Sequence, residues 1–389
     1  MPTKLLNMIL VLTVAFIMSC EERYWPELDA NTASALVVDG VITNALPPYT
    51  INLSRSSNVE SHDYIPMSNY EVSIVDNFGN EELLNEMEAG RYVSSADGMQ
   101  GIVGRNYKLI LRSPDGRYYN SEFEMLKEPI GIESVYTEVE YEDSETPPYQ
   151  IPGYRFYINT ELAQNDSTYL FWLLDETYKF ESDYYIYFYY DGTLHPVVNR
   201  DTLKNCWGSG RVFPFFVEST LSLSEPRFTH YPLHFVNTKT RKLSVKYSLL
   251  VNQYTINKNV FRFWNSVKQQ NEDGGELYPR QPFQVRGNVY NVDDENELVL
   301  GFFMVAGVAQ KRIFVDRPTL PVKMYYPICE LTEDDFEAYG FMFIGGGTAS
   351  WPLFITEDEN GSRALPNQAC IDCTYKGGSL DEPDFWTDN

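Results

Sequence analysis

Short runs in which apolar and polar residues alternate recur along the first third of the chain. The segments 70–76 and 106–113 show this alternation most clearly. A period of two residues indicates β-strands with one face buried. Turn sequences such as Pro114-Asp115-Gly116 separate these runs. About seven short strands within 34–128 are the pattern of an immunoglobulin-like β-sandwich, although the usual Cys…Trp…Cys framework is absent.

A second, larger region follows at 129–389, and its apolar runs again favour strands. One segment, 257–271, has a different period. Phe261, Trp264 and Val267 recur there at helical spacing, so they share a face that we expect to pack on the sheets. The sequence therefore predicts a mainly β protein, in which an immunoglobulin-like sandwich precedes a β-rich domain with one clear helix and a Cys-containing C-terminal loop.

The N-terminus predicts export and lipidation. An almost unbroken apolar run of fourteen residues, 5–18, is too short to cross a hydrocarbon core of about 30 Å as a helix. It matches the apolar part of a secretory signal. Ser19 then places a small residue before Cys20, the arrangement that lipoprotein signal peptidase accepts. We expect 1–19 to be a lipoprotein signal peptide, Cys20 to carry lipid and 20–33 to be a tether. An ordinary signal peptide with an unrelated cysteine is the alternative.

Composition and charge exclude some classes of protein and of partner. Aromatic residues form 15% of the chain, with 29 Tyr and 23 Phe, which excludes a disordered acidic tail. The formal net charge is −25, and removing 1–19 takes away one lysine and no acid, which makes it −26. No basic surplus neutralises phosphates, so we expect no nucleic-acid partner. Strong acidity suits a cationic partner without choosing one.

Four cysteines remain after Cys20: Cys206, Cys329, Cys370 and Cys373. They allow three pairings, and the sequence does not choose among them. Outside the inner membrane we expect them to form disulfides. The Cys370-x-x-Cys373 spacing also fits a redox motif or half of a zinc site. Our interpretation is a stapled C-terminal loop, joined either within itself or back to Cys206 or Cys329.

No catalytic arrangement is evident, so we predict a protein that is not an enzyme and that carries no cofactor or metal. His230 and His234 are four residues apart, but Pro232 between them makes a helical metal pair unlikely to form. No Gly-x-Ser-x-Gly elbow is present. A hydrolase site assembled from acids that are distant in sequence is the alternative.

The aromatic run 184–190 is the most suggestive binding feature. In a strand, Tyr185, Tyr187 and Tyr189 would line one face as a stripe suited to stacking on sugars or docking a partner. A strand buried on both sides is the alternative. Separately, Ser167 and Thr202 lie in Asp-Ser-Thr and Asp-Thr-Leu tripeptides, which resemble the short O-glycosylation sequon of Bacteroidota.

Several spaced motifs resemble one lipoprotein family of the Bacteroidota. They include Leu36-Val37-Val38-Asp39-Gly40, Gly101-Ile102-Val103-Gly104-Arg105, Phe263-Trp264, Leu300-Gly301-Phe302-Phe303, Cys370-Ile371-Asp372-Cys373 and Pro383-Asp384-Phe385-Trp386. This family carries only a domain-of-unknown-function label, four-two-four-nine. Its genes often lie beside those of TonB-dependent receptors, so the resemblance implies an accessory role at the cell surface and supplies no catalytic residues. The acidic pair Glu21-Glu22 also resembles a surface-export signal of such lipoproteins.

Our leading hypothesis is a lipid-anchored outer-membrane protein, exposed at the cell surface, that binds a TonB-dependent β-barrel receptor or a nutrient and assists uptake. The alternative is a stand-alone adhesin that binds carbohydrate or protein through the tyrosine stripe. A surface hydrolase is the third.

Overall fold

The computed structural model describes residues 35–57, 64–163, 168–273, 285–319, 321–345 and 351–387, and it is mainly β, as predicted. The predicted signal peptide, Cys20, the tether and Ser167 lie outside these residues. Among the helices in the described part, none is both long and apolar enough to cross a membrane.

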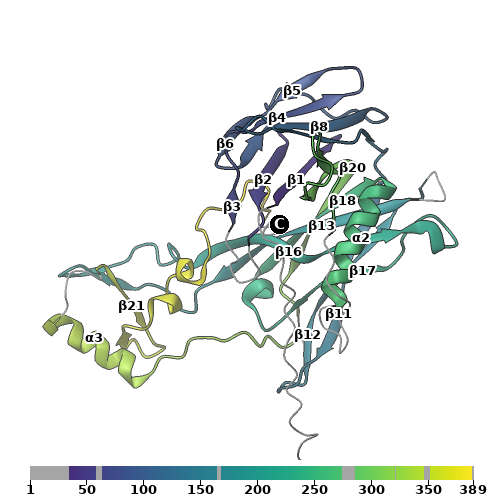
Figure 1. Cartoon of the computed structure of the whole chain (residues 1–389). Helices are drawn as coiled ribbons and strands as arrows, with labels where there is room; N and C mark the ends of the chain where they lie inside the picture. The colour runs from purple at the N-terminus through teal and green to yellow at the C-terminus, as the bar shows by residue number, and fades with distance from the viewer. Residues whose placement is uncertain are drawn as a thin grey trace, which may run out of the picture.

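Within the described residues, a nine-stranded sheet forms the centre of the protein, and we call it the central sheet (Figure 1). In spatial order its strands are β16 (Asn205–Ser219), β13 (Tyr169–Glu181), β18 (Lys246–Ile256), β20 (Val299–Asp316), β1 (Leu36–Thr43), β2 (Thr50–Arg55), β7 (Arg91–Val93) and β6 (Asn85–Glu88), with β3 (Ile65–Pro66) beside β2. Strands β1 and β20 are parallel, and the other neighbours are antiparallel.

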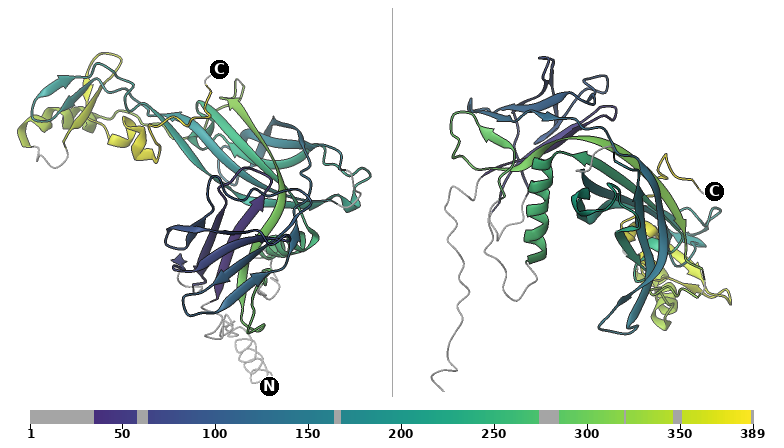
Figure 2. Two further views of the ribbon diagram at one scale, coloured as in Figure 1. Left: turned by 90° about the horizontal axis from the view of Figure 1, so that it is seen from above. Right: turned by 90° about the vertical axis from the view of Figure 1, so that its right-hand side faces the viewer.

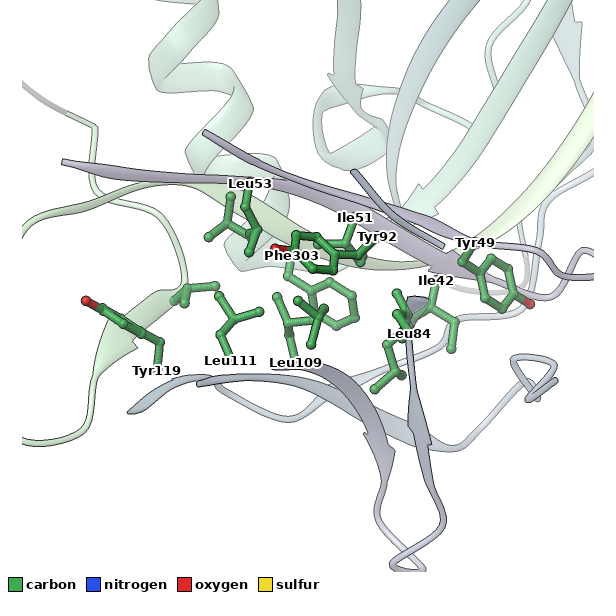
Figure 3. Close-up of a cluster of buried hydrophobic side chains, with 14 of the residues drawn as sticks. Ile42, Tyr49, Ile51, Leu53, Leu84, Tyr92, Leu109, Leu111, Tyr119 and Phe303 are labelled. Carbon is green, nitrogen blue, oxygen red and sulfur yellow. The ribbon is translucent and has the colours of Figure 1, made fainter. Parts of the chain in front are cut away.

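A second sheet covers one end of the central sheet. Its strands are β19 (Val289–Asn291), β9 (Tyr118–Ser121), β8 (Asn106–Arg112), β4 (Glu71–Asp76) and β5 (Glu81–Leu83), with β10 (Glu124–Met125) beside β8. Ile51 and Phe303 of the central sheet meet Leu109 and Leu111 of this cover in one buried cluster (Figure 3). Burying one such side chain contributes roughly 1.5–3 kcal/mol, so this cluster holds the two layers together.

The predicted boundary at 129 does not separate two independent sheets. Strand β20 lies beside β1, with Val38 opposite Gly301, and β19 pairs with β9 of the cover sheet. The sandwich predicted for 34–128 is therefore completed by residues 289–316. Strand β20 is apolar on both faces, with Phe303 in the sandwich core and Phe302 in a different buried cluster, so it is stable only inside a sheet that is covered on both sides.

A third sheet packs on the face of the central sheet that also carries the cover sheet, beside that cover. It consists of β11 (Ile132–Asp143), β12 (Gln150–Thr160) and β17 (Tyr231–Asn237). Alternation along β13 explains the packing, because Leu170, Trp172 and Leu174 point into the cluster under this sheet, whereas Phe171 belongs to a cluster on the opposite face.

Helix α2 (Lys258–Asp273) lies on that opposite face, which we call the concave face because the sheet bends over the helix there (Figure 2, right). The ring of Trp264 stacks on that of Phe171 at 4.9 Å between centroids, and Phe261 contacts Tyr169 at 4.8 Å. The helix predicted near 257–271 is confirmed, and its aromatic residues pack on the sheet as the spacing indicated.

The C-terminal part forms a lobe that projects from the side of the central sheet (Figure 2, left). Its strands are β14 (Phe188–Tyr190), β15 (Leu194–Pro196), β21 (Leu353–Glu357) and β22 (Arg363–Ala364), and its helix is α3 (Glu333–Gly345). Short 3₁₀ turns lie at Thr220–Ser222, Arg241–Leu243, Gln368–Cys370 and Cys373–Lys376. The one clear helix of the prediction is α2. Helix α3 is a second one that the sequence did not reveal, because its apolar residues are spread around the helix and no helical period marks it.

Candidate binding groove on the central sheet

Helix α2 covers only part of the concave face and leaves a hollow beside it, which we call the groove. The hollow has a volume of about 540 Å³. Strands far apart in the sequence, helix α2 and the loop before β2 contribute its apolar lining, which includes Val41, Leu46, Phe171, Leu173, Phe213, Phe215, Tyr254, Trp264, Phe302, Met304 and Val308. A concave hollow of this size, lined by apolar and aromatic side chains with a few polar groups, is typical of ligand sites.

An irregularity in β16 shapes one wall of the groove. Trp172 pairs with Phe216, and Leu174 with Val212, so three residues of β16 stand opposite one residue of β13. Such a bulge bends the strand and re-aims its side chains. Phe213 lies in this bulge and is 81% exposed. Phe213 thus extends the apolar lining of the groove to its exposed rim.

A row of hydrogen-bonded polar side chains crosses the concave face at the edge of the groove. The Arg211 Nε atom lies 3.4 Å from Asp175 Oδ1, and Asn252 Nδ2 donates to Asp175 Oδ2 at 2.8 Å. Gln310 Nε2 donates to Asn252 Oδ1 at 2.6 Å. These residues belong to β16, β13, β18 and β20 in spatial order. The row therefore fixes charged and polar groups on a rigid sheet, as a preorganised site requires.

A second carboxylate, that of Asp39, lines the groove from β1. Its residue is exposed, and Asn52 Nδ2 approaches Asp39 Oδ2 at 3.4 Å. Tyr254 lies within the electrostatic reach of both carboxylates. Burial raises the pKa of Tyr254, Arg211 lowers it, and Asp175 and Asp39 raise it further. The hydroxyl is therefore a neutral hydrogen-bond donor at neutral pH.

Comparison with known protein families gives the groove a context. A family model described as "Domain of unknown function (DUF4249)" matches residues 21–312. The chain belongs to this family. No curated protein matches the sequence. The matched range contains every residue that lines the groove, whereas helix α3 and strand β21 lie beyond its end. In this DUF4249 protein the groove therefore belongs to the part that defines the family.

A second hollow, of about 580 Å³, lies at the start of α2 and bears on the hydrolase alternative. Glu124, Glu128 and Glu161 line it. Burial raises the pKa of Glu124, and a hydrogen bond from Asn259 Nδ2 at 3.4 Å opposes that rise. Among the described residues no hydrogen bond joins two of these carboxyls. Among the residues described, this cleft thus places the buried carboxyl of Glu124 near two other acids without a hydrogen bond between any two of them.

The tyrosine stripe predicted for 184–190 is not a continuous strand. Only Phe188–Tyr190 is extended in the sheet of the lobe, and Tyr185 and Tyr187 precede it. The three tyrosines each stack against a basic side chain or histidine: Lys204 Nζ lies 4.5 Å from the ring centroid of Tyr185, Arg200 4.2 Å from that of Tyr187, and His195 4.7 Å from that of Tyr189. One face of each ring is therefore already occupied within the protein. The stripe lies in the lobe and contributes nothing to the groove.

The cysteines form two disulfides, as expected, and each joins the C-terminal loop to an earlier part of the chain. Cys206 pairs with Cys373, and Cys329 pairs with Cys370. The two cysteines of the Cys-x-x-Cys sequence thus have different partners, which removes the redox and zinc interpretations.

Thr202, the described candidate for O-glycosylation, is exposed in a turn, and its hydroxyl donates to the Asn199 carbonyl at 2.7 Å.

The histidine pair does not form a metal site. Within the described part of the chain no cluster of three or more metal-ligating residues occurs. The ring of His230 stacks on that of Tyr157 at 3.9 Å between centroids. His234 is partly buried in β17, and its Nε2 atom is buried without a hydrogen-bond partner among the described residues.

His234 should make the protein less stable in mild acid. Burial lowers the pKa of His234 from 6.5 to about 4. As the pH falls from 6.5 to 4, the unfolded chain binds a proton at this residue and the folded chain does not, so the free energy of unfolding decreases. Urea unfolding across that pH range measures how the free energy of unfolding changes with pH. In His234→Phe this slope should correspond to up to one fewer proton taken up on unfolding. His195→Gln, at a solvent-accessible position, is the control, and an unchanged pH slope in His234→Phe would contradict the assignment.

Proposed function

We propose that this protein is a non-enzymatic, lipid-anchored binding protein of the outer membrane, facing the cell surface, that assists uptake through a TonB-dependent β-barrel receptor. The observation that carries the binding role is the groove on the concave face. Its aromatic lining stands open on a rigid sheet, and the polar row fixes hydrogen-bonding groups at its edge. Binding requires only such a prearranged surface.

The sequence at the N-terminus supports the location. A diacylglyceryl group on Cys20 would hold the protein at a membrane, since each buried methylene of a lipid chain contributes about 0.8 kcal/mol. The net charge of −26 that remains after removal of 1–19 keeps such a protein soluble above the lipid surface. The family resemblance noted above supports the receptor as partner.

Co-purification from mildly solubilised outer membranes tests this function. We expect the tagged wild-type protein to recover a β-barrel receptor and Cys20→Ala to leave the membrane fraction. Phe213→Asp, at the exposed rim of the groove, should reduce receptor recovery several-fold because it places a charge in the apolar interface. Phe78→Asp is the matched control, since Phe78 is 72% exposed on a distant turn.

Repeated recovery of the membrane-bound protein without any β-barrel receptor would refute the receptor partnership. Ligand binding that persists in that case would favour the alternative, a stand-alone adhesin.

A further inference from the structure

We propose that the groove selects an amphipathic cation, that is, an apolar or aromatic body that carries one positive charge. This inference rests on the proposed binding function of the groove and names the class of ligand.

The lining determines the body of the ligand. Tyr254, Phe302 and Met304 lie on neighbouring strands of the concave face, and Phe213 stands at the rim. Aromatic and thioether side chains favour flat apolar groups, and a hollow of about 540 Å³ accommodates a molecule of drug-like size. The rigid sheet behind them lowers the entropic cost of binding.

The charged side chains at the groove determine the sign of the charge that the ligand carries. The carboxylate of Asp175 is offset by Arg211 at 3.4 Å and by the amide of Asn252 at 2.8 Å. Asp39 has no basic partner within ion-pair distance among the described residues, and only the Asn52 amide approaches it. The groove thus keeps one carboxylate that a positive group can pair with and that a negative group would meet unfavourably.

Two further features act in the same direction. The faces of aromatic rings attract cations, and Trp and Tyr do so more strongly than Phe. Trp264 and Tyr254 both line the groove. The strongly negative net charge concentrates cations near the surface and repels anions. Asp39 stands opposite Phe302 in the pairing of β1 with β20, so the acidic and apolar parts of the groove are adjacent.

A positive charge on an apolar body occurs both in small aromatic amines and in peptides with a basic residue. Two pairs of probes separate these sources in calorimetric titrations of the full mature chain. Tryptamine is compared with indole-3-propionate, and acetyl-Phe-Lys-Leu-amide with acetyl-Phe-Glu-Leu-amide. The members of each pair have similar bodies and opposite charges.

We expect the cationic member of at least one pair to bind about tenfold more tightly than its anionic partner. The pair that shows this difference identifies the source of the ligand. Asp39→Asn should remove most of the preference, and so should raised salt concentration. Glu81→Gln, which removes an exposed carboxylate on β5 away from the groove, should leave the preference unchanged.

The inference is overturned if no cationic probe binds, if anionic probes bind equally well, or if the preference survives in Asp39→Asn. Equal binding of both signs, lost in Phe213→Asp, would retain the groove as a binding site and reject the charge selection. The receptor co-purification tests the proposed function independently of these titrations.

Discussion

Replacing Trp172 with alanine should lower the free energy of unfolding by roughly 3–5 kcal/mol. The Trp172 side chain is fully buried between the central sheet and the sheet of β11, β12 and β17. Its ring stacks on Tyr231 at 5.2 Å and meets Phe228 edge-on at 5.4 Å. Its Nε1 atom donates to Gln253 Oε1 at 2.9 Å. Alanine would leave a cavity and an unsatisfied buried amide oxygen at once.

Urea unfolding followed by circular dichroism measures this effect. Phe213→Ala is the matched control, because an equally apolar aromatic ring is removed there from an exposed position, and we expect a change below about 0.5 kcal/mol. A loss of less than about 1 kcal/mol in Trp172→Ala would show that the two layers do not depend on this contact.

Local periodicity was enough to predict the parts of the fold that are short in sequence. The alternation in 70–76 and 106–113 corresponds to β4 and β8, and the helical spacing of Phe261 and Trp264 corresponds to α2. These signals are reliable because one face of each element is buried and the other is not. Helix α3 lacks that contrast, and the pairing of β20 with β1 joins residues far apart in the sequence, so both followed only from the structure.

The groove was not predictable because its lining comes from seven elements whose order in space differs from their order in the chain. Phe171, Tyr254 and Phe302 are brought together by the pairing of β13, β18 and β20. The one local signal is Phe213-Pro214-Phe215, since a proline inside an apolar run indicates an edge strand or a bulge. The tyrosine run 184–190 drew attention instead, because aromatic density alone does not show which face is open.

The pairing of the cysteines also depends on contacts between residues far apart in the sequence. One of the two disulfides connects the lobe to the central sheet. Spacing in the sequence suggested oxidised cysteines without choosing partners, whereas the fold places Cys373 beside Cys206 on β16. Ionic hydrogen bonds provide a second connection. Asp183 accepts one from Arg241 at 2.7 Å and one from Lys376 at 2.7 Å. These two contacts lower the pKa of Asp183 against the opposing effect of its burial. The lobe is thus held by a covalent link and a buried ion pair together.

Removing the Cys206–Cys373 link should be the more costly of the two disulfide deletions. The double substitution Cys206→Ala/Cys373→Ala opens a loop of 167 residues, and we expect a loss of roughly 2–5 kcal/mol. Cys329→Ala/Cys370→Ala opens a loop of 41 residues. Chain entropy alone makes its cost about 1 kcal/mol smaller, since the entropy grows with the logarithm of loop length.

Urea unfolding of the two double variants under identical non-reducing conditions measures the difference, and wild-type protein treated with reductant provides the combined effect. Fluorescence and circular dichroism should be recorded together, because transitions that no longer coincide would indicate that the lobe unfolds before the central sheet. Early unfolding is expected only in Cys206→Ala/Cys373→Ala, since its deleted link joins the lobe to β16 directly. A larger loss in Cys329→Ala/Cys370→Ala would instead show that local packing within the lobe, rather than its attachment to the central sheet, sets its stability.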